Sequence, residues 1–293
     1  MVLKWIDKNL KYIFTLPTII FVLAMILFPL LYTFVLSFFE WSMSNNVPMS
    51  FVGFDNYINL FSDDRFILAV VRTFAFSGIA LFFEVVLGIA IALFLNRKIV
   101  GQNLIKTAFL LPMVATPVAI GLVWTLIYEP TMGIANVLVK AVGLEPLIWL
   151  GSEETALASL MVVDIWQWTP MVMLVVLAGI TSLSTEPFES AKVDGATRWQ
   201  TLWQITLPLL RPTIFTAILL RLIDVLKTFD IIYSTTQGGP GFATETMNIL
   251  SFRQAFEYFQ FGTASATLVV FFIIVLSISA IFIKIKNRVE VDY

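Results

Sequence analysis

The chain has 293 residues, of which 59% are apolar and only 13% are charged, and its mean hydropathy is +0.90. Soluble domains carry about a quarter charged residues, so this composition excludes an ordinary soluble globular protein. Cysteine and histidine are absent, which excludes disulfides, thiol catalysis and the commonest proton shuttle and metal ligand. The formal net charge of −2 gives little information about partners, and we expect no nucleic acid among them.

Apolar segments of about 20 residues recur along the chain, which is the length that a helix needs to cross about 30 Å of hydrocarbon. An open sheet would leave backbone groups unpaired in lipid, so these segments are expected as α-helices. The sequence therefore predicts an all-α integral membrane protein with six transmembrane helices. They are expected at residues 12–39, 67–95, 104–127, 156–180, 213–234 and 264–285. We interpret the first as a retained anchor, because its apolar region exceeds the about 7–15 residues of a signal-peptide core.

Basic residues are distributed unevenly between the segments that connect these spans. Twelve lie in one alternating set of segments, namely Lys4, Lys8, Lys11, Arg97, Lys98, Lys106, Lys192, Arg198, Arg211, Lys284, Lys286 and Arg288. The other set holds three, namely Arg65, Lys140 and Arg253. Because cytoplasmic loops carry the excess of Lys and Arg, both termini are expected in the cytoplasm. The expected layout is a cytoplasmic interfacial segment (1–11), a transmembrane domain (12–285) with a cytoplasmic loop (184–211), and a cytoplasmic tail (286–293).

The segments on the opposite side are expected to be partly ordered. Residues 40–66 are aromatic and acidic, and too apolar for a plain linker. The second segment contains a possible short helix, Gly133–Val142, ended by Gly143. The third opens with a turn-rich "TQGGPG", and its continuation over 243–259 is typical of an amphipathic surface helix.

Polar residues also occur within the spans. Span four carries Asp164, Gln167 and Trp168 on one helical face, and span two carries Glu84. A charged side chain at mid-bilayer costs about 2.5–3.5 kcal/mol on insertion scales, so such residues need partners or water. We interpret Glu84 first as a hydrogen-bond partner between helices.

The cytoplasmic loop has strong helix signals. Ser184 or Thr185 can cap a helix that has Pro187 in its first turn, and Gly195 can close it. Thr197 and Gln200 form a T-x-x-Q capping box for a second helix. Its apolar stripe consists of Trp199, Leu202, Trp203 and Thr206, and Pro208 is expected to interrupt it before span five begins beyond Pro212. The loop is either an interfacial helix anchored by its tryptophans or a docking element for a partner's groove.

Span five contains charges of alternating sign at every third position: Arg221, Asp224, Lys227 and Asp230. This spacing predicts the neighbouring pairs Arg221–Asp224 and Lys227–Asp230. The charges either form a structural network or line a hydrated translocation path. Carboxylates and amides can hydrogen-bond to sugar hydroxyls, and aromatic rings can lie against the C–H faces of a sugar. The balance of charge in span five favours a neutral or weakly charged solute. The candidate path residues are Asp164, Gln167, Trp168, Asp224, Lys227, Asp230 and Tyr233.

The stretch from Glu189 to Pro208 carries a specific motif. It reads E-S-A, three residues, Gly195, nine residues, Ile205, one residue, and Leu207-Pro208. It resembles the signature loop of bacterial ABC-importer permeases, E-A-A followed by the same spacing, with Ser190 in place of alanine as the only departure. "FVGFDNY" (51–57) and "TFDIIYSTTQGGPG" (228–241) resemble segments of the maltose-type carbohydrate permeases, so the resemblance covers most of the chain from about residue 10 onward.

The resemblance implies the ABC type I importer permease fold and a transport subunit, not an enzyme, for a sugar, oligosaccharide or polyol. The loop would be a coupling helix in a cleft of the ATP-hydrolysing subunit. The coupling residues implied are Phe188, Glu189, Ser190, Ala191, Asp194, Gly195, Trp199, Ile205, Leu207 and Pro208. The implied partners are a second permease subunit, two ATPase subunits that bind ATP and Mg, and an extracytoplasmic solute-binding protein, all at the bacterial cytoplasmic membrane. No phosphate-binding G-x-x-x-x-G-K-[ST] loop occurs in this chain, for which we expect no cofactor, metal or catalytic residue.

Two other classes of protein are possible from the residues alone. A proton- or sodium-coupled secondary transporter would use the membrane carboxylates, although the absence of an internal repeat argues against it. An intramembrane enzyme is disfavoured, because Asp63-Asp64-Arg65 lacks the further aspartate of a magnesium-binding D-D-x-x-D site.

Overall fold

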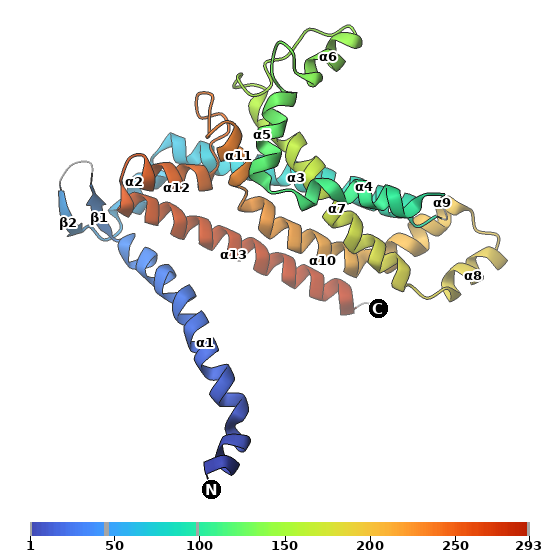
Figure 1. The fold of residues 1–293 in the computed structure, drawn as a ribbon, viewed down its shortest axis with the longest axis horizontal. Helices are drawn as coiled ribbons and strands as arrows, with labels where there is room; N and C mark the ends of the chain where they lie inside the picture. Colours follow the sequence, from blue (N-terminus) through green and yellow to red (C-terminus); the bar gives the residue numbers. More distant parts are fainter. Residues whose placement is uncertain (1, 44–46, 98–99, 292–293) are drawn as a thin grey trace. The chain divides into compact units, whose positions relative to one another are not determined.

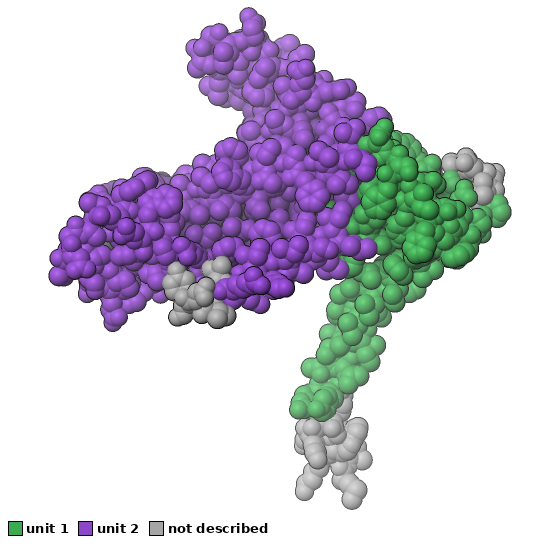
Figure 2. Space-filling view, turned by 180° about the vertical axis from the view of Figure 1, so that it is seen from behind, with its two compact units in different colours: residues 1–66, 250–272 green, residues 67–249, 273–293 purple. Residues whose placement is uncertain are grey.

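Helices dominate the computed structural model, as the composition predicts (Figure 1). It describes residues 2–43, 47–97 and 100–291, so Lys98 and the last two residues of the expected tail lie outside the described residues. The chain forms two units, one of residues 1–66 and 250–272 and the other of residues 67–249 and 273–293 (Figure 2). The first is unit 1 and the second is unit 2.

The elements follow the chain in a simple order. The helices are α1 (Val2–Leu36), α2 (Asp55–Phe61), α3 (Asp64–Leu95), α4 (Gln102–Val114), α5 (Pro117–Ile127), α6 (Ile134–Ala141), α7 (Ala156–Ser182), α8 (Glu186–Val193), α9 (Arg198–Thr201), the π-helix η1 (Leu202–Thr206), α10 (Leu207–Leu226), α11 (Asp230–Thr235), α12 (Met247–Phe256) and α13 (Phe261–Val291). The strands are β1 (Phe39–Ser42) and β2 (Val47–Phe51).

Unit 1 contains a β-hairpin that the sequence did not predict. Strands β1 and β2 pair antiparallel, and the rings of the opposing residues Phe39 and Phe51 meet edge to face with centroids 5.4 Å apart. Asn56 of α2 donates from Nδ2 to the carbonyl oxygens of Ser37 (2.8 Å) and Phe39 (2.9 Å). The aromatic segment 40–66 is therefore ordered by ring contacts and by one buried amide.

Four helices in the described part of the chain are long and apolar enough to cross a membrane, namely Leu10–Leu36, Asp64–Leu95, Ala156–Ser182 and Phe261–Arg288. The bent pair α4–α5 makes a fifth if it counts as one span, and its two halves meet at 99°. The predicted continuous helix over 104–127 is therefore wrong. Ala115 and Thr116 are extended. Pro117 disfavours helical conformation at Thr116, the residue before it.

The predicted fifth span is also divided. Helix α10 ends at Leu226, with Lys227 as its C-cap, and α11 begins at Asp230. The stop expected at Pro208 is wrong as well, since the π-helix η1 leads directly into α10. Pro208 lies in the first turn of α10, directly after this π-helix.

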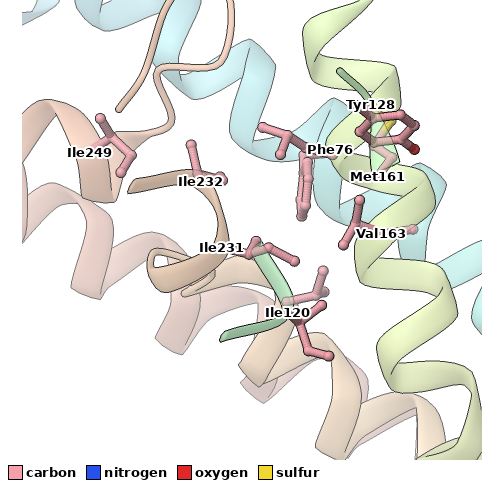
Figure 3. Packing of buried hydrophobic residues seen from close by; sticks show 11 residues of the cluster. Phe76, Ile120, Tyr128, Met161, Val163, Ile231, Ile232 and Ile249 are labelled. Atoms are coloured by element: carbon pink, nitrogen blue, oxygen red, sulfur yellow. The ribbon is translucent and has the colours of Figure 1, made fainter. Parts of the chain in front are cut away.

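Unit 2 is organised around α7, which packs against α4 and α10. More than half of the residues of α7 are buried. One apolar cluster joins α3, α5, α7 and α11, and Figure 3 shows Phe76, Met161 and Ile231 among its side chains. Gly121 of α5 lies so close to α11 that an added Cβ would collide with Ser234 Oγ. The polar residues Ser159, Asp164 and Gln167 of α7 are buried in the interior of unit 2.

Candidate functional site

A buried ion cluster connects three helices of unit 2. Arg221 of α10 donates from Nε to Glu84 Oε2 (2.7 Å) and from Nη2 to Glu84 Oε1 (2.9 Å), a bidentate pair with α3. Its Nη2 also contacts Asp164 of α7. All three side chains are at most 1% exposed. The guanidinium carbon lies 5.1 Å from the centroid of the Trp168 ring, within cation–π distance.

These contacts correct the predicted pairing in span five. Arg221 pairs with carboxylates of two other helices instead of with Asp224, because its side chain points into the bundle. Asp224 pairs with Lys227, with 3.7 Å between Oδ1 and Nζ, and both side chains are about half exposed. Such exposed pairs contribute about 0–1 kcal/mol. The helical spacing expected between Lys227 and Asp230 does not hold, since α10 ends at Leu226 and α11 begins only at Asp230.

A polar cavity of about 310 Å³ lies beside this cluster. Its wall brings together six of the seven candidate path residues, namely Asp164, Gln167, Trp168, Asp224, Lys227 and Asp230. The seventh, Tyr233, does not line it, but its ring stacks on Phe229 with centroids 5.2 Å apart, and Phe229 does line it. Residues that belong to two different predicted spans thus line one cavity.

Two helix breaks meet at this cavity. Pro117 comes from the break between α4 and α5, and Thr228 and Phe229 come from the break between α10 and α11. Sequence reasoning missed these three residues as lining, although the Thr-Pro step at 116–117 is a readable signal for the first break. Broken helices are the usual way in which membrane transporters expose polar groups at mid-membrane depth.

The side-chain amide of Gln167 has one atom with a hydrogen-bond partner and one atom without. Its Nε2 donates to the carbonyl oxygen of Ala115 (3.3 Å), which the break between α4 and α5 has left without a helical partner. Its Oε1 is buried and has no hydrogen-bond partner among the described residues. A buried acceptor without a donor is costly, and this one belongs to a residue that lines the cavity.

The second candidate element is the predicted coupling loop, which folds as two short helices and a turn. Helix α8 ends in a turn at Gly195, whose φ of +71° is left-handed, and the Ala196 N–H donates to the carbonyl oxygen of Ala191 (2.9 Å). The predicted capping box is confirmed, since Thr197 N–H donates to Gln200 Oε1 (2.8 Å) and Gln200 N–H donates to Thr197 Oγ1 (3.3 Å). At the start of α8, Ser184 Oγ accepts from Glu186 N–H (3.4 Å).

Most candidate coupling residues are accessible. Glu189, Ser190, Asp194, Gly195 and Trp199 are exposed, Phe188, Ile205, Leu207 and Pro208 are half-buried, and Ala191 is buried. The rings of Trp199 and Trp203 meet edge to face at 5.6 Å, and 68% and 55% of these residues is exposed. The predicted single stripe is divided, because Thr206 is buried. The loop therefore presents a polar and aromatic surface at the opposite end of α7 from α6 (Figure 1).

A larger cavity of about 880 Å³ has an almost entirely apolar wall from α3, α4, α5 and α7. The hydroxyl of Thr169 in this wall already donates to the carbonyl oxygen of Ile165 (2.6 Å). The wall therefore has little to offer a polar solute. Among the described residues, no group of three or more acidic side chains is placed to hold a metal ion.

Membrane-length helices, a polar cavity at two helix breaks and a folded loop at the end of the central helix define a membrane transport protein. The chain belongs to the family described as "Binding-protein-dependent transport system inner membrane component", whose profile matches residues 84–288. This region includes the cavity, the ion cluster and the coupling loop. The protein is therefore a permease subunit of an ABC transporter. Members of this family are transport subunits and not enzymes.

Relatives and solved structures agree with this assignment. The chain is 32% identical over 283 residues to the trehalose/maltose transport system permease protein MalF of Thermococcus litoralis, covering 97% of this chain and 95% of the relative. Its fold is similar to a chain of a bacterial alginate ABC transporter crystallised with an alginate pentasaccharide-bound periplasmic protein. The TM-score is 0.84 and the identity 26%, covering 98% and 97% of the two chains. A second structure, described as involved in import of the acidic polysaccharide alginate, gives a TM-score of 0.84 at 27% identity, covering 98% of each chain.

Proposed function

We propose that this chain forms part of the path by which a sugar, oligosaccharide or polyol crosses the bacterial cytoplasmic membrane. The observation that carries the proposal is the cavity of about 310 Å³, which gathers carboxylates, an amide and aromatic rings. The relatives named for trehalose, maltose and alginate support a carbohydrate cargo. Hydroxyl groups can donate to the carboxylates and to Gln167, and the apolar faces of a sugar can lie against Trp168.

The proposed topology has six spans with both termini in the cytoplasm. The spans are α1, α3, the bent pair α4–α5, α7, α10 with α11, and α13. Helix α10 is less apolar than the other spans because it carries Arg211, Arg221 and Asp224. The buried charge of Arg221 is neutralised by Glu84 and Asp164. The proposed domains are the interfacial segment 1–11, the transmembrane domain 12–285 with the cytoplasmic loop 184–211, and the tail from 286.

The proposed complex supplies the energy from outside this chain. Two ATPase subunits bind ATP and Mg and receive the coupling loop, a second permease subunit completes the path, and an extracytoplasmic binding protein delivers the solute. The exposed surface of α8 and of Trp199 supports a docking role. Because α8 follows directly on α7, a push on α8 acts on the helix that carries Asp164 and Gln167. Alternating access around the cavity would result.

This function is tested by uptake into proteoliposomes that hold the whole complex. We expect sugar uptake that needs ATP and the binding protein, and that continues when ionophores remove the proton and sodium gradients. The measurement is accumulation of radiolabelled trehalose or maltose, with a substrate screen of the binding protein to choose the sugar. Uptake that survives ATP depletion and stops with the ion gradients would instead support the ion-coupled alternative.

Gln167→Met tests the role of the cavity wall. Methionine has a similar shape and no oxygen acceptor, so the bound sugar loses a hydrogen bond worth about 1–3 kcal/mol. We expect KM for uptake to rise about 5- to 150-fold, while basal ATP hydrolysis and assembly of the complex stay normal. Val162→Met, at an exposed position of the same helix that does not line the polar cavity, is the matched control and should leave KM unchanged. An unchanged KM in Gln167→Met would remove this residue from the path.

A further inference from the structure

The polar cavity has more negative than positive groups in its wall. Its ionisable residues are Asp164, Asp224, Asp230, Arg221 and Lys227. The charge of Arg221 is shared by two carboxylates, because Glu84 behind the wall binds it as well as Asp164. The balance of charge that span five has in the sequence is therefore replaced by an acidic excess.

The way in which the charged groups pair explains why negative charge exceeds positive charge in the cavity wall. The ion cluster holds two carboxylates against one guanidinium, so it carries one negative charge unless a proton is shared within it. Asp224 and Lys227 neutralise each other. Asp230 is exposed at the first position of α11 and adds a further negative charge. The wall stays negative even if the cluster binds one proton.

The same wall contains a second feature that points to a ligand. Gln167 is fully buried, lines the cavity and keeps Oε1 without a donor. This oxygen, like the carboxylates, accepts hydrogen bonds and repels anions. A hydroxyl or an ammonium group satisfies such acceptors, and a carboxylate, sulfonate or phosphate group does not.

We propose that this cavity selects its cargo by charge, admitting neutral or amine-bearing sugars and polyols and rejecting sugar acids and sugar phosphates. The inference rests on the proposed function, since it names the substrate class of the same path. It separates this chain from the similar transporter that imports an acidic polysaccharide. Asp224 and Asp230 are the specificity-determining residues, since they lie in the wall outside the ion cluster.

The charge of the cavity can be measured directly, because the natural chain has no cysteine. Thr228→Cys places a thiol of nearly the same size in the wall. In the assembled complex, the thiol reacts with a cationic (trimethylammonium-ethyl) or an anionic (sulfonato-ethyl) methanethiosulfonate, and mass spectrometry of this chain gives both rates. Ala141→Cys, exposed on α6, is the matched control.

We expect the ratio of cationic to anionic rate at position 228 to exceed the control ratio at least about tenfold, since a cleft of one charge sign concentrates counter-ions. The double substitution Asp224→Asn, Asp230→Asn should bring the ratio near the control, and Lys227→Gln should raise it further. A ratio equal to the control, or no reaction with either reagent, overturns the proposal. These rates do not depend on transport, so failure of sugar uptake would affect the proposed function and leave the charge result intact.

Discussion

Arg221→Met will destabilise the protein by about 3–5 kcal/mol, because removing one partner of a buried ion cluster leaves charge uncompensated. Glu84 and Asp164 are at most 1% exposed, so water cannot replace the guanidinium. By the usual relation between free energy and melting temperature, the midpoint should fall by roughly 6–20 °C. Thermal unfolding of the detergent-solubilised complex, followed by fluorescence-detected size exclusion, measures the change.

The control is a variant without any of the three charges. Arg221→Met combined with Glu84→Gln and Asp164→Asn should recover most of the stability, because neutral amides cost far less to bury than unpaired carboxylates. Arg221→Lys should recover only part of it, since an ammonium cannot form the bidentate contact with Glu84. A melting temperature that is unchanged in Arg221→Met would refute a stabilising role for the cluster.

Gly195→Asp will abolish sugar uptake while this chain still folds. A Cβ at Gly195 would meet no atom of this chain within 4 Å, so the only internal penalty is its φ of +71°. That penalty is about 1–2 kcal/mol for most residues, and aspartate tolerates this conformation better than most. If an ATPase subunit closes over the glycine, the added carboxylate blocks docking. We expect uptake below about one hundredth of wild type, and ATP hydrolysis that no longer responds to the loaded binding protein.

Gly143 provides a matched control for this experiment. It also has a left-handed φ, of +80°, and an added Cβ there also meets no atom within 4 Å. It lies after α6, at the other end of α7 from the coupling loop. Gly143→Asp should therefore keep ATP-driven uptake. Equal loss of uptake in both variants would mean that backbone strain, and not a partner's surface, explains the effect at Gly195.

The parts of the structure that could be predicted depend on local interactions. The capping box at Thr197–Gln200, the turn at Gly195 and the helix near Gly133 follow from contacts within a few residues, and all three are present. The break at Pro117 was also readable, since it follows from a rule about a single dipeptide. The division of span five was not, because α10 ends within an alternating charge pattern that looks continuous in sequence.

The pairing of the buried charges could not be predicted from spacing. Arg221 is 137 residues from Glu84 and 57 from Asp164, and nothing local brings them together. The i, i+3 spacing predicted Asp224 as the partner of Arg221. Because Arg221 is buried between helices, its guanidinium instead contacts carboxylates on two other helices. The polar residues of α7 and α10 could be singled out from the sequence as a group, because charge within an apolar span is costly wherever its partner lies.

The ion cluster has a mechanical consequence. If α3, α7 or α10 slid past its neighbours, a charge would be separated from its counter-charge in the interior of unit 2. The ion cluster therefore opposes relative sliding of these three helices. The two interruptions, at 115–116 and 227–229, have no such restraint from the cluster, and the short helices beyond them, α5 and α11, are tightly packed together at Gly121 and Ser234. We therefore expect relative movement of helices in unit 2 to take place at these two interruptions, which adjoin the cavity.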